Sequence, residues 1–253
     1  MVQVAIEFAA ASDASEASSR PATGSKIAAK KVETSSGISP ARSGAGAVSS
    51  PQLSREVPLQ ESAWTSLQFK KIKANQVEFV DQELRVKVRS SASPLIHALP
   101  EPLQVAKVRV RGSWEEQQAA QRSSLEFDED SLLRVGLVVP GQLTLSGPRR
   151  WLAADWVKKL FDLAPQGAGI DRIEFLMMAS REDWVGRQRV HPHSELIRER
   201  AMSLRPPPGD FDVEWKLTRP IPAAALWLSV DGDDGGASFD LKLLRIELGL
   251  PEN

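Results

Sequence analysis

The sequence contains no cysteine and no tyrosine among its 253 residues. The missing cysteine excludes disulfides, cysteine nucleophiles, thiolate zinc sites and iron–sulfur clusters. It does not fix the redox compartment, because a large domain is stable without disulfides in either environment. The missing tyrosine leaves the seven tryptophans as the main aromatic side chains for contact with a ligand.

The chain also lacks an excess of charge of either sign. It has 32 basic and 33 acidic residues, a formal net charge of −1 and a pI of about 6.4. A nucleic-acid-binding domain is typically basic, with a pI above about 9, so this composition predicts no nucleic-acid partner. No polybasic cluster is present to meet an anionic membrane surface, and no run approaches the roughly 20 apolar residues of a membrane span.

Residues 1–60 are rich in Ala and Ser and contain no tryptophan. Such a segment buries too little apolar surface to offset its ordering entropy, so we predict a disordered arm. The first ten residues have neither a basic region nor a long apolar run and are not an intact signal peptide. The composition is typical of the spacer that follows an export signal, which indicates a periplasmic or secreted protein. The alternative is a flexible cytoplasmic tail.

From Trp64 onward the sequence alternates between short apolar and polar positions, and residues 61–253 are predicted to form one domain. Residues 77–80 and 84–88 predict a hairpin, and residues 132–139 are apolar throughout, as in a strand covered on both faces. Residues 151–163 have apolar positions at helical spacing and predict the one helix. Further strands are expected at 94–98, 105–114, 170–178, 211–217, 224–230 and 239–248.

Turn residues and residues that interrupt strands separate these segments. Pro100 and Pro102 are expected to end the strand before them, because proline removes a ladder donor. The charged, proline-rich stretch 180–210 is expected to be a long surface loop that carries one helical turn. In the last strand the inward positions change register between Leu243 and Leu244, which predicts a β-bulge. With eight or nine strands and no βαβ alternation, the fold class is all-β, an antiparallel, jelly-roll-like β-sandwich.

Short segments in the same order resemble a group of uncharacterised bacterial secreted proteins whose jelly-roll domain is similar to galactose-binding and carbohydrate-binding modules. The resemblance covers roughly residues 64–250. It implies a sandwich and export, and it supplies no catalytic residues. The segments that carry it are Phe69–Ile72, Ser91–Leu95, Asp128–Leu137, Ala225–Asp234 and Phe239–Ile246.

The run Asp231-Gly-Asp233-Asp234-Gly-Gly offers closely spaced oxygen ligands in a flexible loop. Calcium takes 6–8 oxygen ligands at about 2.3–2.6 Å, so the run predicts a structural calcium site. It is not an EF-hand, because Lys242 stands at the twelfth position where that motif has Glu. The alternative is a solvated Asp/Gly turn between two strands.

Asp128 and Asp130 precede a predicted strand, as Asp231 follows one. If these strand ends meet, Asp128 and Asp130 join Asp231, Asp233 and Asp234 in a negative rim that could hold the cation. The same carboxylates could instead serve glycoside hydrolysis, which requires pairs about 5 Å or about 6.5–9.5 Å apart. Acidic clusters at strand ends are more often solvated turns.

Four residues are the candidates for binding an organic ligand. Trp184 lies in a charged loop, where an exposed ring could stack on a sugar. Arg109, Arg111 and Arg134 project from predicted strands and could form a polar floor for a ligand such as an acidic sugar. The alternatives are a core tryptophan and a solvated sheet face.

The sequence therefore favours a non-catalytic binding domain of the bacterial cell envelope, with a glycan or an envelope protein as its partner. No nucleophile elbow, phosphate-binding loop or dinucleotide fingerprint is present, so an enzyme is the less favoured class. A structural or protein-interaction sandwich without a small ligand is the main alternative, and a glycan hydrolase is the third.

Overall fold

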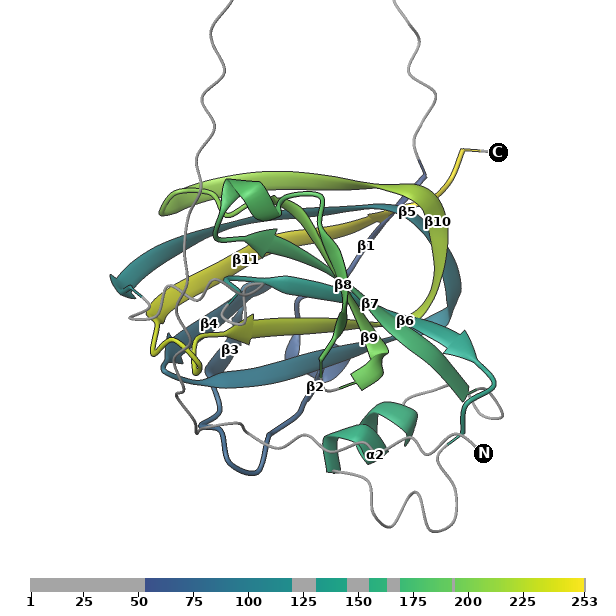
Figure 1. Ribbon diagram of the computed structural model, residues 1–253, viewed down its shortest axis with the longest axis horizontal. Helices are drawn as coiled ribbons and strands as arrows, with labels where there is room; N and C mark the ends of the chain where they lie inside the picture. The colour runs from purple at the N-terminus through teal and green to yellow at the C-terminus, as the bar shows by residue number, and fades with distance from the viewer. Residues whose placement is uncertain (1–52, 120–130, 145–154, 163–168, 193, 253) are drawn as a thin grey trace, which may run out of the picture. The chain divides into compact units, whose positions relative to one another are not determined.

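The structure is a computed structural model that describes residues 53–119, 131–144, 155–162, 169–192 and 194–252 (Figure 1). No helix in these residues is long and apolar enough to cross a membrane. The helical elements are η1 (Glu61–Ala63), α2 (Asp155–Asp162) and η2 (Glu182–Trp184). The strands are β1 (Ser54–Glu56), β2 (Thr65–Ser66), β3 (Gln76–Val80), β4 (Glu83–Arg89), β5 (Ala92–Gln118), β6 (Arg134–Gly141), β7 (Gly169–Ala179), β8 (Gln188–His191), β9 (Ser194–Leu204), β10 (Gly209–Asp231) and β11 (Ser238–Gly249).

The described strands form one 11-stranded sheet in the order β3-β4-β11-β5-β10-β6-β7-β9-β8, with β1 on β11 and β2 on β5. Within this part of the chain every pair is antiparallel except β7 with β9. The prediction of an all-β, mostly antiparallel fold with one short helix is confirmed.

The two longest strands, β5 and β10, pair with each other twice and bend between the two stretches. Residues 92–98 of β5 pair with 225–231 of β10, and residues 107–114 pair with 209–216. Register shifts and four prolines (Pro100, Pro102, Pro220 and Pro222) lie at the corner between these stretches. Figure 1 shows both strands curving round together. The sheet is thereby divided into a first half-sheet, β3-β4-β11-β5-β10, and a second half-sheet, β5-β10-β6-β7-β9-β8.

The main core lies between the two half-sheets, which makes the fold a sandwich. Because side chains alternate along a strand, every second residue of the central strands enters this core. Each such side chain contributes about 1.5–3 kcal/mol by leaving water. The first half-sheet supplies Val86, Val88, Val108, Val110, Leu241 and Leu243, and the second supplies Leu95, Val135, Leu137, Leu226 and Leu228.

A second apolar cluster covers the outer face of the second half-sheet. Val157 and Leu160 of α2 pack there against Ile173 and Ile197. Beside them the rings of Phe175 and Trp227 meet edge to face, with centroids 5.9 Å apart. They flank Gly136 in the pairing register, so the absent side chain of this glycine leaves room for both rings.

The hairpin of β3 and β4 is confirmed, and Asp81 and Gln82 have the positive φ angles of a two-residue hairpin turn. The predicted bulge is also confirmed, because the register of β11 shifts between Leu243 and Arg245. The fold begins earlier than the predicted boundary at residue 60, since β1 pairs with β11 and Val57 is buried. Residues 1–52 of the predicted arm lie outside the described residues.

Two expectations about where strands are interrupted were wrong. Pro100 and Pro102 do not end a strand but lie at the bend of β5. Residues 180–210 are not a long loop, since they contain β8 and β9. The helical turn expected in this stretch is η2. The charged residues hid β9, because Glu199 is only 2% exposed and points to the same face as the apolar Ile197 and Ala201.

Substitution of Gly136 by Val should lower the free energy of unfolding by about 1–3 kcal/mol, as overpacking typically does. An added Cβ would lie 2.8 Å from the Phe175 ring and 2.9 Å from Ile173. Urea denaturation measures the change, with the exposed position Gln76→Val in β3 as the matched control. Equal stability of Gly136→Val and the wild type would contradict the packing described here.

Candidate functional site

None of the tryptophans whose burial the structure describes offers an exposed stacking surface. Trp184, at the end of η2, is 3% exposed and packs against Met177, Ala179 and Ala201. The Arg181 guanidinium lies 5.0 Å from the centroid of its ring. The expectation of an exposed Trp184 ring was therefore wrong, because η2 turns this side chain into the sheet. All the other tryptophans whose burial the structure describes (Trp64, Trp114, Trp215 and Trp227) are buried as well.

Arg109 and Arg111 lie on the outer face of the first half-sheet, where charges of both signs alternate. Arg109 donates two hydrogen bonds of 2.7 Å to the two carboxylate oxygens of Asp212, and Arg111 is 3.4 Å from the same group. These guanidinium groups hold the pKa of Asp212 below its ordinary value. Similar pairs join Lys107 to Glu214 on this face. Arg109 and Arg111 therefore fit a solvated sheet face better than a ligand floor.

Arg134 lies apart from them, on the outer face of the second half-sheet. It is 9% exposed, and its guanidinium donates a hydrogen bond of 3.0 Å to Asp231. Its Nε lies 3.9 Å from Glu199, which also accepts a 2.6 Å hydrogen bond from Arg189. The structure thus does not bring the three predicted arginines together, and it shows a buried ion network around Arg134.

The acidic run forms a compact oxygen cluster between β10 and β11. One carboxylate oxygen from each of Asp231, Asp233 and Asp234 lies within 4.8 Å of the other two. Asp231 Oδ1 is buried and has no hydrogen-bond partner, while Oδ2 accepts the bond from Arg134. Asp128 and Asp130, the other predicted metal ligands, lie outside the described residues.

Buried polar side chains that the sequence analysis missed hold this loop in place. Asn75 donates a 2.8 Å hydrogen bond to the carbonyl of Val230 and accepts one of 2.8 Å from Ser91. The amide of Gly232 donates to the Ser91 carbonyl, at 3.2 Å. The signal in the sequence was a polar residue directly before an apolar strand, as at Ser91. The three carboxylates therefore project from a backbone that is already ordered.

Burial raises the pKa of Asp231 from 3.8 to about 8. Arg134 opposes this shift, whereas the neighbouring Asp233 carboxyl adds to it. Two carboxyl groups at this separation repel each other when both are ionised, and either a shared proton or a bound cation removes the repulsion. The donor set is all oxygen, which suits a hard divalent cation such as calcium.

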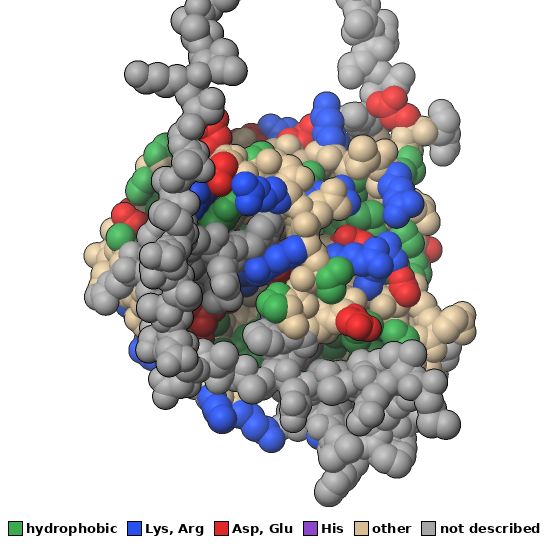
Figure 2. All heavy atoms as spheres, viewed as in Figure 1, with side chains coloured by type: hydrophobic (Ala, Val, Ile, Leu, Met, Phe, Trp, Pro, Cys, Tyr) green, Lys and Arg blue, Asp and Glu red, His purple; other side chains and the backbone are tan. Residues whose placement is uncertain are grey.

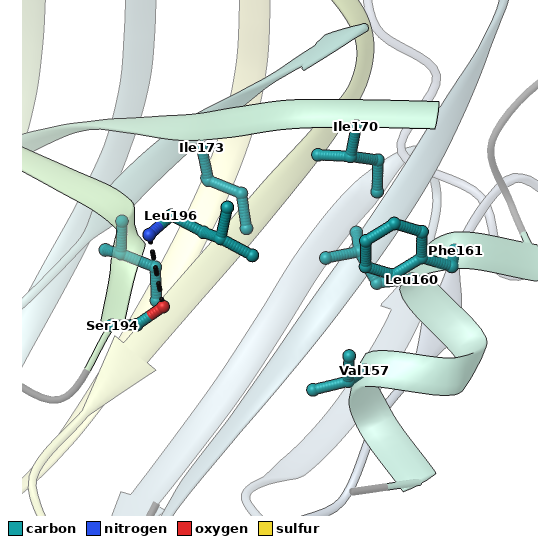
Figure 3. Close-up of a pocket in the computed structure, with 8 residues that line it drawn as sticks. Val157, Leu160, Phe161, Ile170, Ile173, Ser194 and Leu196 are labelled. Atoms are coloured by element: carbon teal, nitrogen blue, oxygen red, sulfur yellow. Dashed lines mark hydrogen bonds between the residues drawn. The ribbon is translucent and has the colours of Figure 1, made fainter. Parts of the chain in front are cut away.

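A small apolar pocket lies elsewhere, between α2 and the strands β7 and β9 (Figure 3). Its one polar side chain, Ser194, accepts a 3.3 Å hydrogen bond from the amide of Leu196. The pocket therefore presents no convergent polar groups. Its other lining residues are Val157, Leu160, Phe161, Ile170, Ile173, Leu196 and Ile197.

Arg134→Gln should lower the free energy of unfolding by about 3 kcal/mol, because it removes the cationic partner of the buried Asp231 and one of the two arginines beside Glu199. Arg111→Gln is the matched control, and its effect should stay below about 1 kcal/mol because its ion pair is exposed. Chemical denaturation of both variants tests the contrast. If both variants lose a similar amount of unfolding free energy, the ion pairs of Arg134 contribute no more than an exposed ion pair does.

Asp231 should make the metal-free protein less stable as the pH rises. Its folded pKa is raised, so its contribution to stability is full below pH 4 and is lost as the pH rises through about 8. Burial lowers the pKa of His97, so His97 has the opposite effect: its contribution is lost as the pH falls below about 6.5. Comparison of Tm at pH 5–9 with Asp231→Asn isolates the first effect. Parallel profiles for the two proteins would contradict it.

No protein-family model matches this sequence, and no curated protein matches it significantly. Two solved structures are similar in fold. One is the family 11 carbohydrate-binding module of the cellulosomal cellulase Lic26A-Cel5E of Clostridium thermocellum, with 7% identity, a TM-score of 0.38, and 81% of this chain and 99% of the module covered. The other is the exoplasmic/lumenal domain of VIP36 in its Ca²⁺/Man3GlcNAc-bound form, with 10% identity, a TM-score of 0.37, and 79% and 89% covered. At these values neither likeness carries an inference about ligand or activity.

Proposed function

We propose that this protein is a non-catalytic binding domain whose ligand is a glycan and whose β10–β11 loop holds a structural calcium ion. The observation that carries the proposal is the cluster of Asp231, Asp233 and Asp234 oxygens within 4.8 Å of one another. Two oxygens bound to one calcium ion can be at most about 5.2 Å apart, twice the longest usual Ca–O distance. The spacing of the three carboxylates therefore suits a single ion.

The surroundings of the loop favour a structural role for the cation. Asp231 Oδ1 is buried without a hydrogen-bond partner, and a cation would supply the missing interaction. Asp234 is exposed, so water or a ligand hydroxyl can complete a coordination shell of 6–8 oxygens. The hydrogen bonds of Asn75 and Ser91 hold the loop before the ion binds. These features support a calcium ion that stabilises the β10–β11 edge of the fold.

A glycan suits this surface better than an apolar ligand does. The exposed large apolar side chains of the described residues are few. On the face seen in Figure 2, hydrophobic side chains form small patches among charged ones. Sugars present hydroxyl groups that charged side chains and calcium can bind directly. Location in the cell envelope is part of the proposal, and the Ala/Ser-rich composition of residues 1–60 supports it. Fractionation of the native cells would test that location.

Calcium should raise the Tm by roughly 5–10 °C at about 100 times its Kd, and EDTA should reverse the rise. The shift should be larger at pH 8.5 than at pH 5.5, because binding displaces the proton held by Asp231. The double variant Asp233→Asn/Asp234→Asn should lose the shift, whereas Asp210→Asn, at an exposed strand position, should keep it. The same proteins on a glycan array, with calcium and with EDTA, test the ligand.

Binding of the wild type to a defined glycan establishes the binding domain, and sensitivity to EDTA adds the calcium ion. A blank array in both buffers removes the glycan from the proposal. The second candidate is then a protein-interaction domain, which the apolar pocket beside α2 favours. If the Tm does not respond to calcium at either pH, the calcium ion is no longer part of the proposal.

A further inference from the structure

Three arginines lie together on the core-facing side of the second half-sheet, beyond the edge of the apolar core. Arg172 is on β7, and Arg198 and Arg200 are on β9, which pairs with β7 so that Arg198 is opposite Glu174. Residues two apart on a strand share a face. On this face Leu176 belongs to the main core and Met202 packs against it, which fixes the orientation. We call Arg172, Arg198 and Arg200 the arginine strip.

Among the described residues, two carboxylates, Glu174 and Asp171, contact the strip, which has three guanidinium groups. Arg172 donates a 2.5 Å hydrogen bond to Glu174 and a second one to Asp171. Arg198 lies 3.8 Å from the same Glu174 oxygen, and its side chain is 52% exposed. Glu174 is thus shared between two arginines, and its stronger contact is with Arg172.

Arg200 makes its described hydrogen bonds to neutral groups. It donates to the Gln188 side-chain oxygen at 3.2 Å and to the Thr218 hydroxyl at 3.5 Å. Among the ion pairs of the described residues, none joins Arg200 to a carboxylate. The strip therefore carries a net positive charge on a rigid strand pair.

On the outer face of the first half-sheet, by contrast, carboxylates pair with the arginines. There Arg109 and Arg111 share Asp212, and Arg245 pairs with both Glu56 and Glu247. Every one of these arginines has a carboxylate within 3.4 Å. Arg198 and Arg200 have no such contact in the described part of the chain. The strip is therefore better suited to an anion from outside than the arginines of the first half-sheet are.

We infer that the arginine strip binds the carboxylate groups of an acidic, uronate-containing polysaccharide. The planar guanidinium fork matches a carboxylate in a bidentate manner, and two arginines at successive same-face positions are about 6.6–6.8 Å apart. The five tryptophans whose burial the structure describes are all buried, so charge rather than ring stacking would select the sugar. The inference rests on the proposed glycan function and names the class of glycan and the residues that contact it.

The experiment measures the affinity of the full chain for polygalacturonate, dextran sulfate and neutral dextran by affinity electrophoresis at low and physiological salt. The wild type should bind polygalacturonate, and more weakly as salt rises. Arg198→Gln/Arg200→Gln should lose at least about tenfold in affinity, as expected for removal of charge-assisted hydrogen bonds. Arg109→Gln/Arg111→Gln changes the net charge equally and should bind like the wild type. Unchanged near-UV circular dichroism and Tm show that both variants are folded.

Loss of polygalacturonate binding in the strip variant alone supports the inference. Equal loss in both double variants would show diffuse attraction and overturn it. Tighter binding of dextran sulfate, lost with the strip, would overturn the choice of carboxylate. Binding of neutral glycans alone, on dextran or on the array, would overturn the strip and leave the glycan function standing. If the protein binds no polysaccharide in affinity electrophoresis and no glycan on the array, both the arginine strip as a binding site and the glycan function are rejected.

Discussion

The fold depends on the antiparallel pairing of β5 with β10, which continues across a bend. Each strand belongs to both half-sheets, so one ladder of backbone hydrogen bonds fixes how the two layers face each other. Prolines and register shifts at the corner allow the turn, because proline removes donors that the bend could not keep paired. The main core can close only because this pair brings Val108 and Leu226 into the same apolar layer.

The same ladder positions the candidate calcium site. Asp231 is the last residue of β10 and pairs with Ala92 at the start of β5. Its carboxylate accepts a hydrogen bond from Arg134 of the neighbouring β6. A carboxylate at that position loses water whether or not a cation is bound, which raises its pKa. Asn75 and Ser91 satisfy the backbone around it. The acidic loop is therefore an ordered part of the fold, unlike an ordinary solvated hairpin turn.

Alternation of apolar and polar residues predicted the fold class, the hairpin of β3 and β4 and the bulge in β11, because one face of each strand lies in the core. It failed at β9, where Glu199 is buried on the outer face among apolar residues and is compensated by Arg189 and Arg134. It also failed at Trp184, whose burial depends on Ala201 of a strand that was not expected. These failures share a cause, since the compensating partner is distant in sequence or in an unpredicted element.

The arginines show why a candidate site is harder to predict than a fold. Alternation identifies the face from which an arginine projects, but its availability to a ligand depends on the residue opposite. Asp212 lies 103 positions from Arg109 and accepts hydrogen bonds from two nitrogens of its guanidinium, Nε and Nη2. Arg200 faces Gln188 and Thr218 instead, although its local sequence is no less charged. Strand register decides between these two outcomes, so an arginine's role follows from pairing that local sequence does not contain.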